Sequence, residues 1–143
     1  MFGIHFMKRL TVPANTPWEE TICYSRAVRV GDFIAVSQTS AVDANGDISG
    51  GSDPYAQAIH ALRNVEAALR TVGASMEDVV RSRIYLARFS DLQPVAKAHA
   101  EVFRKIRPAI SILTCDMVSP DILVEFDVDA VLGTSNDHDR SGA

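Results

Sequence analysis

Two stretches of the sequence place apolar residues at helical spacing, three or four positions apart. The first follows Asp53 and Pro54, an aspartate that suits a helix cap and a proline that suits the first helical position. Its apolar face consists of Ile59, Leu62, Val65, Leu69 and Val72. Gly73 ends the stretch, so the pattern predicts a helix that fills the interval between Asp53 and Gly73.

The second stretch follows Ser90 and Asp91, either of which can cap a helix, and it has Pro94 in its first turn. Its inner face consists of Val95, Ala98, Val102 and Ile106. Pro108 ends this second predicted helix.

The remaining apolar pattern predicts strands, because it is rich in β-branched and aromatic residues and is interrupted by turn signals. Gly31–Asp32 joins a hairpin, and Ser119–Pro120–Asp121 separates the last two strands. The predicted strands cover residues 8–12, 23–30, 33–39, 79–89, 109–117 and 122–132. This element order predicts an α+β fold, in which two helices pack on one face of a mixed, largely antiparallel sheet.

Charged residues alternate with apolar ones on two of these strands. Within 79–89, one side carries Val80, Ile84 and Leu86, and the other carries Arg81, Arg83 and Tyr85. The last strand carries Glu125, Asp127 and Asp129 on one face, where three carboxylates repel each other. We therefore expect some of them to meet an arginine, with Arg81, Arg83 and Arg88 as the candidates.

Apolar strand residues exceed what two helices on one side of a sheet can cover. They include Val36, Ile112, Phe126 and Val128. Self-association would bury this surplus, so the pattern predicts an oligomer.

The length of 143 residues suits one domain, which we place at residues 8–133. Residues 1–7 form an N-terminal extension that lacks the basic start and cleavage site of a signal peptide, and 134–143 form a polar tail that we expect to be disordered. No apolar run approaches the roughly 18 residues of a membrane helix, so we expect no membrane partner.

The formal net charge is -4, and lysine and arginine are spread along the chain, which disfavours a nucleic-acid partner. Cys23 and Cys115 are too few for a disulfide framework and favour a reducing cytoplasm. Because Cys115 has no evident activating partner, we expect it to be structural. His60 and His99 fall inside the predicted helices without metal-ligand spacing, so we expect no metal.

Several segments occur in an order and at a spacing that one known family shares. They are Tyr24–Gly31, Val36–Ser37, Asn64–Glu66, Gly73–Val80, Arg107–Ala109 and Val124–Phe126. On these segments, residues 24–131 resemble the Rid family, also called YjgF/YER057c/UK114 or endoribonuclease L-PSP. The resemblance implies the chorismate-mutase-like YjgF fold and a homotrimer whose three sheets form a central barrel-like core. It also implies ligand clefts between subunits, where the best-studied members hydrolyse enamines and imines to keto acids and ammonia; we expect no cofactor.

Carried over by position, the resemblance assigns Tyr24 to the tyrosine that lines the cleft and Glu125 to the catalytic glutamate that holds the attacking water. The carbonyl of Ile112 takes the place of a backbone oxygen that also contacts this water. The substrate-binding arginine of the family is replaced by Ile110, and the usual glycine after the serine of the second hairpin strand is replaced by Gln38.

The replacement at Ile110 removes two charge-assisted hydrogen bonds, each worth roughly 1.5–3 kcal/mol, which weakens binding of an imino acid by about 10²- to 10⁴-fold. It also favours the protonated form of Glu125, which loses a neighbouring cation. Arg26 lies two positions beyond Tyr24 and Arg83 two before Tyr85, so either is a candidate for a substitute cation. Ser37 is a further candidate to hydrogen-bond a ligand.

Three functions remain open. The first is a Rid-like trimer that binds a small carbonyl or carboxylate metabolite in clefts lined by Tyr24, Ile110, Ile112 and Glu125, without standard 2-imino acid deaminase activity. The second is an enamine or imine deaminase of altered specificity that uses water positioned by Glu125. The third, a ribonuclease, is disfavoured by the acidic charge balance.

Overall fold

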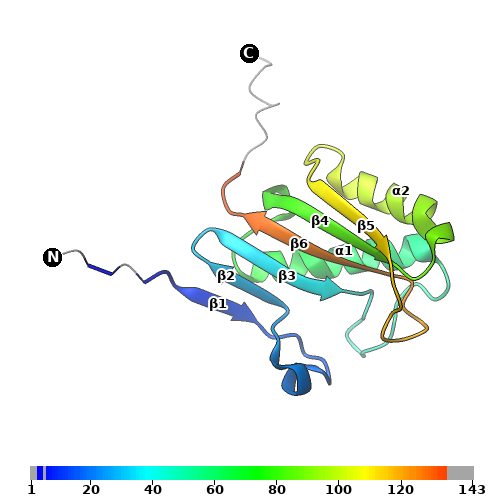
Figure 1. The fold of residues 1–143 in the computed structure, drawn as a ribbon, viewed down its shortest axis with the longest axis horizontal. Helices are drawn as coiled ribbons and strands as arrows, with labels where there is room; N and C mark the ends of the chain where they lie inside the picture. The colour runs from blue at the N-terminus through cyan, green and yellow to red at the C-terminus, as the bar shows by residue number, and fades with distance from the viewer. Residues whose placement is uncertain (1–2, 5, 135–143) are drawn as a thin grey trace, which may run out of the picture.

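The computed structural model of the chain describes residues 3–4 and 6–134. Within these residues lie six strands and two α-helices (Figure 1). In chain order they are β1 (Arg9–Val12), β2 (Ala27–Val30), β3 (Phe33–Thr39), α1 (Pro54–Thr71), β4 (Val79–Leu86), α2 (Leu92–Phe103), β5 (Ala109–Thr114) and β6 (Val124–Val131). The predicted tail falls almost entirely outside the described residues.

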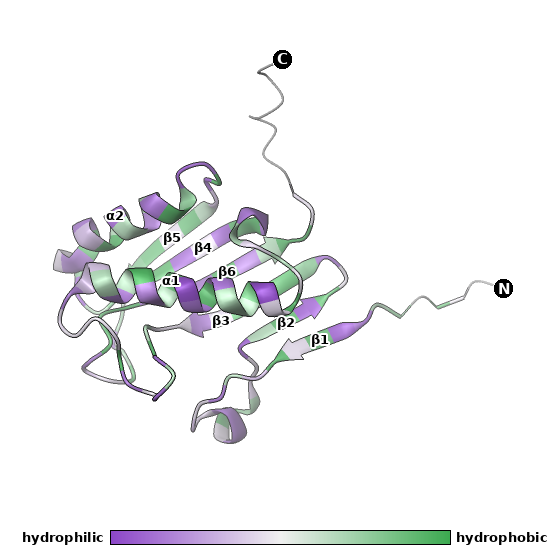
Figure 2. Cartoon of the chain, turned by 180° about the vertical axis from the view of Figure 1, so that it is seen from behind, coloured by the Kyte–Doolittle hydropathy of each residue, from purple (hydrophilic) through white to green (hydrophobic). Residues whose placement is uncertain are grey.

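The strands form one sheet in the order β1-β2-β3-β6-β4-β5. All neighbouring strands are antiparallel except β4 and β5, which are parallel and are connected through α2. Seen from behind, both helices lie across the same face of the sheet (Figure 2). The predicted α+β architecture is therefore confirmed: two helices cover one face of a mixed, largely antiparallel sheet.

The two helices begin where the sequence predicts, but only one by the predicted mechanism. The carboxylate of Asp53 caps α1 by accepting hydrogen bonds from the backbone N–H groups of Tyr55 (2.9 Å) and Ala56 (3.3 Å). Asp91 occupies the N-cap position of α2, but its carboxylate makes no cap hydrogen bond. It accepts hydrogen bonds from Arg88 instead, at 3.1 and 3.2 Å.

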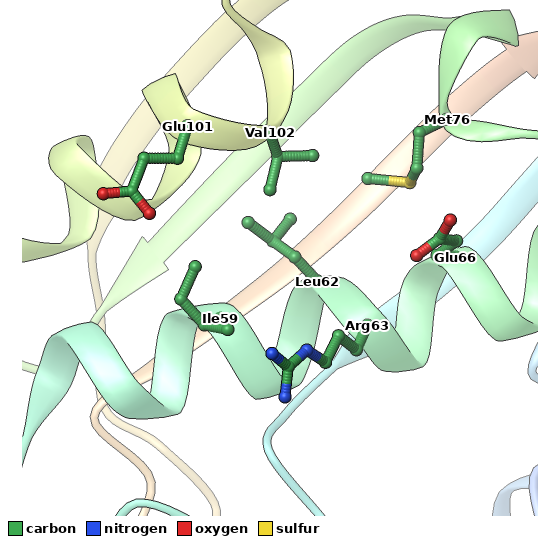
Figure 3. A pocket seen from close by; sticks show the side chains of 7 residues that line it. All are labelled: Ile59, Leu62, Arg63, Glu66, Met76, Glu101 and Val102. Carbon is green, nitrogen blue, oxygen red and sulfur yellow. The ribbon is translucent and has the colours of Figure 1, made fainter.

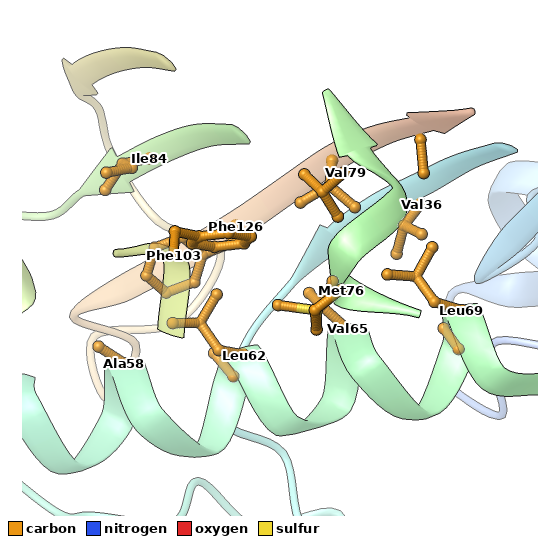
Figure 4. Close-up of a cluster of buried hydrophobic side chains, with 14 of the residues drawn as sticks. Val36, Ala58, Leu62, Val65, Leu69, Met76, Val79, Ile84, Phe103 and Phe126 are labelled. Carbon is orange, nitrogen blue, oxygen red and sulfur yellow. The ribbon is translucent and has the colours of Figure 1, made fainter. Parts of the chain in front are cut away.

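The core lies between the helices and the sheet (Figure 4). Ile34 of β3 and Phe126 of β6 meet Leu62 and Leu69 of α1 and Phe103 of α2, and all five side chains are buried. Burying one side chain of this size stabilises the fold by roughly 1.5–3 kcal/mol. This layer holds β6, the strand that carries Glu125, in the middle of the sheet.

The prediction that apolar strand residues remain uncovered by the helices is wrong for three of the four residues it named. Val36, Phe126 and Val128 all face the helices, and each is at most 3% exposed. Alternation along β3 and β6 therefore directs the intervening, mostly polar residues to the other face, here called the open face. Ile112 is 44% exposed on the edge strand β5, so it is the one member of that set left without cover in the protomer.

The alternation predicted for β4 holds from Arg81 onward but is wrong at its start. Ile84 and Leu86 are buried on the helix side, as predicted. An irregularity in the pairing with β6 lies between Val79 and Arg81. It turns Val79 into the core and leaves Val80 41% exposed, because an extra residue in a strand reverses the side-chain alternation.

The first predicted hairpin strand is shorter than expected. Residues Glu19–Cys23 form a single π-helical turn, and Cys23 has a φ of 62°, in the left-handed region that few residues other than glycine adopt. The strand therefore starts at Ala27, and Tyr24 lies in the connection before it. The segment that follows this turn lies beside β3, because Ser37 of β3 donates a hydrogen bond from its backbone N–H to the backbone oxygen of Arg26.

Candidate functional site

Glu125 is the one carboxylate among the predicted site residues, and it is buried. It lies on β6, pairs with Tyr85 of β4 across the open face, and is 8% exposed. The side-chain amide of Gln38 donates a hydrogen bond to its Oε2. Burial raises the pKa of the Glu125 carboxyl above its ordinary value, while the hydrogen bond from Gln38 and the charge of Arg26 act to lower it.

An irregularity in β3 explains how Gln38 reaches Glu125. Val36 pairs with Val128 of β6, but Thr39 pairs with Phe126, so β3 contains one more residue than β6 between these two pairs. Such a β-bulge bends the strand and redirects its side chains. Thr39 is consequently buried at 4% exposure, and Gln38 lies against the Glu125 carboxylate.

Arg26 and Tyr24 complete a contiguous group with Gln38 and Glu125, here called the Glu125 cluster. Nη1 of Arg26 donates to the backbone oxygen of Gln38 at 2.9 Å and to Oγ1 of Thr39 at 3.0 Å. Its guanidinium carbon lies 5.8 Å from the centre of the Tyr24 ring. Of the two predicted substitute cations, Arg26 is the one that belongs to this cluster, and its charge acts to lower the pKa of the Glu125 carboxyl.

Two hydroxyl contacts fix the edge of the cluster. The hydroxyl of Tyr24 lies 2.6 Å from Oγ1 of Thr16, which positions the ring. Ser37, a predicted ligand contact, donates its hydroxyl to the backbone oxygen of Ser25 at 2.7 Å and so ties β3 to the segment before β2. No pattern in the sequence indicates Thr16, because its contact with Tyr24 depends on the π-helical turn between them.

Ile110 and Ile112 do not join the Glu125 cluster within one protomer. They pair with Ser82 and Ile84 of β4, both buried on the helix side, and paired residues of neighbouring strands point to the same face. Glu125 points to the open face, and β4 separates β5 from β6, a span of about 10 Å for two strand spacings. Ile110 is 49% exposed at the sheet edge.

The other predicted substitute, Arg83, is engaged in ion pairs. Its Nη1 lies 2.8 Å from Oδ1 of Asp127, and its Nη2 lies 3.2 Å from Oδ2 of Asp129. The expectation that an arginine meets these carboxylates is thus confirmed for Arg83. Of the other two candidates, Arg81 donates to the hydroxyl of a serine on β5 (3.3 Å), and Arg88 pairs with a carboxylate at the start of α2.

Tyr85 lies beside these ion pairs on the open face, and the four residues Arg83, Tyr85, Asp127 and Asp129 are here called the charged row. Its hydroxyl donates to Oδ2 of Asp127 at 2.5 Å. Burial first, and then the hydrogen bond to Asp127, raise the pKa of Tyr85 to about 12. The phenol therefore stays protonated at neutral pH and acts as a donor to Asp127.

The remaining candidates, His99 and Cys115, lie outside the Glu125 cluster. His99 on α2 lies with Nε2 3.1 Å from Oγ of Ser82 and packs its ring against Phe103 and Phe126; burial lowers its pKa. Cys115 is half-buried after β5. Among the residues that the structure describes, no three side chains of the metal-ligating types gather at one point, and no helix is long and apolar enough to cross a membrane.

A hollow of about 290 Å³ opens between α1 and α2 (Figure 3). Its floor is Leu62, Met76 and Val102, and charged side chains such as Arg63 and Glu101 form its rim. It lies on the helix side of the sheet, away from Glu125, and no predicted site residue lines it. We therefore assign the candidate site to the Glu125 cluster, where a buried carboxylate, an amide and a guanidinium come together.

Comparison with known proteins is consistent over most of the chain. Residues 16–132 match the protein-family model described as Endoribonuclease L-PSP. An uncharacterized protein of Streptomyces coelicolor is 35% identical over 124 residues, which cover 85% of this chain and 91% of that protein. The 3-aminoacrylate deaminase RutC of Acinetobacter baylyi is 30% identical over 118 residues, 82% of this chain and 93% of the enzyme.

The fold is also similar to solved structures. A crystal structure of a Mycobacterium tuberculosis protein, described as a member of the YjgF/YER057c/UK114 family, superposes with a TM-score of 0.78 at 37% sequence identity. The superposition covers 87% of this chain and all of that one.

Proposed function

Since this chain belongs to the endoribonuclease L-PSP family, also called YjgF/YER057c/UK114 or Rid, we propose that it binds a small metabolite at the Glu125 cluster and lacks standard 2-imino acid deaminase activity. The observation that carries the proposal is the combination of a buried Glu125, hydrogen-bonded by the side-chain amide of Gln38, with an isoleucine at position 110. The first supplies a ligand-binding group, and the second removes the positive charge that holds an imino acid.

The surroundings of Glu125 support a binding role. Burying a carboxylate is costly unless hydrogen bonds or opposite charges compensate it. Here one amide and one guanidinium offset that cost only in part, because the pKa of Glu125 is still raised. Carboxyl groups perturbed by burial together with a specific charged partner are concentrated at functional sites.

A homotrimer with clefts between its subunits is part of the proposal. Ile110 and Ile112 are half-exposed on an edge strand and face away from the Glu125 cluster of their own protomer. A cleft that contains both sets of residues therefore needs the β5 edge of a second copy. Exposed apolar side chains on β3 and β5, namely Phe33, Ile110, Ile112 and Leu113, favour such burial.

The loss of activity follows from the missing guanidinium at position 110. A bidentate contact to a substrate carboxylate comprises two hydrogen bonds of roughly 1.5–3 kcal/mol each, and isoleucine supplies neither. Arg26 replaces it poorly, because its Nη1 already donates to Gln38 and Thr39 and its positive charge already acts on the Glu125 carboxyl, so that charge does not serve a substrate carboxylate as well. We expect a reduction of about 10²- to 10⁴-fold in the efficiency of imino-acid hydrolysis.

A deaminase of altered specificity is the second candidate. Two observations favour it: Glu125 is retained with a raised pKa, which suits a general acid–base group, and RutC, a relative at 30% identity, is named as a 3-aminoacrylate deaminase. In this alternative, Glu125 and the backbone oxygen of Ile112 position the water, and the ligand is held by apolar contact and Arg26. RNA cleavage is not proposed, because the net charge of -4 provides no patch for phosphates.

Ammonia release from freshly generated 2-iminobutanoate tests the proposal. We expect Ile110→Arg to release ammonia about 10²- to 10⁴-fold more efficiently than the wild-type protein, because the substitution restores the carboxylate-binding cation. Glu125→Gln in the Ile110→Arg background removes the acid–base group and should abolish the gain. An inert Ile110→Arg protein that still sediments as a trimer would mean that Gln38 or another departure had already dismantled the water site.

A panel of uncharged imines and enamines separates the two candidates. Release of ammonia from any of them by the wild type, lost in Glu125→Gln, would replace the binding function with the altered deaminase. Sedimentation equilibrium on the same samples tests the trimer, and a monomer at assay concentrations would contradict the intersubunit cleft.

A further inference from the structure

The Glu125 cluster offers hydrogen-bond acceptors and donors side by side. Gln38 uses one N–H on Oε2 of Glu125, which leaves Oε1 of Glu125 and the amide oxygen of Gln38 as acceptors. Arg26 uses Nη1 on two oxygens of β3, which leaves its other N–H groups as donors. A ligand that complements this arrangement presents both an N–H donor and a carbonyl acceptor.

The charges of the cluster act against a second anion. One guanidinium and one carboxylate balance each other, and the positive charge of Arg26 already acts on Glu125. A ligand carboxylate would lie close to the Glu125 carboxylate with no further cation at position 110. Two like charges about 5 Å apart at an effective dielectric constant between those of protein surface and water disfavour binding by roughly threefold to several hundredfold.

Resting on the proposed binding function, we propose that the Glu125 cluster takes an uncharged ligand with an amide-type group, as in a carboxamide or a urea, in preference to a carboxylate. The N–H of the ligand donates to Glu125, and its carbonyl oxygen accepts from Arg26. Gln38 fixes the Glu125 carboxylate for this contact. An amide-type group needs no bidentate arginine, so the isoleucine at position 110 costs such a ligand nothing.

Two probes of the same size and shape test this inference: 2-oxobutanamide and 2-oxobutanoate, which differ in an amide against a carboxylate. Their dissociation constants are measured on the full chain at neutral pH by NMR titration of backbone amide signals. We expect the amide to bind at least about threefold more tightly in the wild type, in line with the lower limit of the like-charge penalty. Glu125→Gln removes that penalty and should reduce or reverse the preference.

Glu66→Gln is the matched control, because Glu66 is a carboxylate on α1 that pairs with Arg70 at the protein surface, outside the cluster. Its amide preference should equal that of the wild type. The inference is overturned if 2-oxobutanoate binds the wild type as tightly as the amide, if Glu125→Gln leaves the preference unchanged, or if neither probe binds. The wild-type comparison decides the matter even if Glu125→Gln does not fold.

Failure here is distinct from failure of the proposed function. A preference for the keto acid without ammonia release from imines would refute the ligand class alone. Brisk ammonia release by the wild type would refute the proposed function, whatever the ratio of the two dissociation constants.

Discussion

Replacing Asp127 with alanine removes the acceptor at the centre of the charged row on the open face. One of its oxygens accepts from Arg83 at 2.8 Å, and the other accepts from the hydroxyl of Tyr85 at 2.5 Å. The Asp127 side chain is 17% exposed, so water cannot fully take over both contacts. The substitution therefore leaves two donors short of a partner on the central strands of the sheet.

The magnitude follows from these contacts. Two hydrogen bonds to a charged acceptor, at roughly 1.5–3 kcal/mol each, set an upper limit of about 3–6 kcal/mol. Arg83 keeps its second ion pair, to Asp129 at 3.2 Å, and its side chain is 35% exposed, so solvent compensates part of the loss. We expect the free energy of unfolding to fall by about 2 kcal/mol.

Tyr85 provides a second readout of the same substitution. Its pKa, about 12, should fall toward its ordinary value of 10.0 without reaching it, because burial, the largest cause of the shift, remains. Since the raised pKa favours the protonated phenol in the folded state, its contribution to stability is complete below pH 10 and is lost as the pH rises toward 12. The Asp127→Ala variant should lose less stability over that interval than the wild type.

Urea unfolding followed by circular dichroism, at one fixed protein concentration, measures the first effect. Tyrosinate absorbance measures the second, with Tyr85→Phe to identify the signal of Tyr85. Asp116→Ala is the control, because Asp116 is an exposed carboxylate in the loop after β5. A loss below about 0.5 kcal/mol, the range of ordinary surface substitutions, together with an unchanged Tyr85 pKa would refute this account of the row.

Three further substitutions or conditions test the fold around the site. Gln57→Leu should lower the free energy of unfolding in urea by about 2–4 kcal/mol. The fully buried Gln57 amide hydrogen-bonds two backbone carbonyls (2.6 and 2.8 Å) and one backbone N–H (2.9 Å), and leucine leaves all three unpaired. A loss near zero would contradict this and would mean that water replaces the amide. Asp53→Ala should lower the free energy of unfolding by about 1 kcal/mol, because α1 loses its cap. Arg70→Ala, at an exposed position, is the control, and equal losses in the two variants would contradict the prediction. Burial lowers the pKa of His99 in the folded protein, so its contribution to stability is complete above its unfolded pKa of 6.5 and is lost as the pH falls through the lower folded value. NMR titration of the imidazole measures this pKa, and an apparent value at or above 6.5 would contradict the prediction.

The sequence predicted the elements well where periodicity and end signals agree. The interval from Asp53 to Gly73 carries a cap, a first-turn proline and an apolar stripe, and α1 occupies it. The pairing of Arg83 with Asp127 could be expected as well, because adjacent like charges on a strand need a partner.

Three features that the sequence did not indicate have a common physical cause, which is backbone irregularity that leaves no mark in the residue pattern. The displaced pairing after Val79 exposes Val80, and the bulge in β3 carries Gln38 onto Glu125. The π-helical turn that ends at Cys23 moves Tyr24 out of the predicted strand. Each involves one extra residue or one left-handed residue, and their positions depend on tertiary packing.

The relative position of Ile110 and Glu125 in the sheet could not be predicted from the sequence either. Strand order is set by long-range pairing, and β6 is inserted between β3 and β4 although it comes last in the chain. This order places Glu125 centrally and Ile110 at the edge, on opposite faces. The sequence could therefore nominate Ile110 and Glu125 as candidate site residues but could not indicate that they lie apart within one protomer.

A side-by-side measurement of ammonia release with the RutC enzyme of Acinetobacter baylyi tests the central claim most directly, with 3-aminoacrylate and 2-iminobutanoate as substrates. The account predicts that kcat/KM of this protein lies at least about a hundredfold below that of RutC, because isoleucine at position 110 cannot hold the substrate carboxylate. A wild-type value within tenfold of RutC on either substrate, abolished by Glu125→Gln, would contradict it.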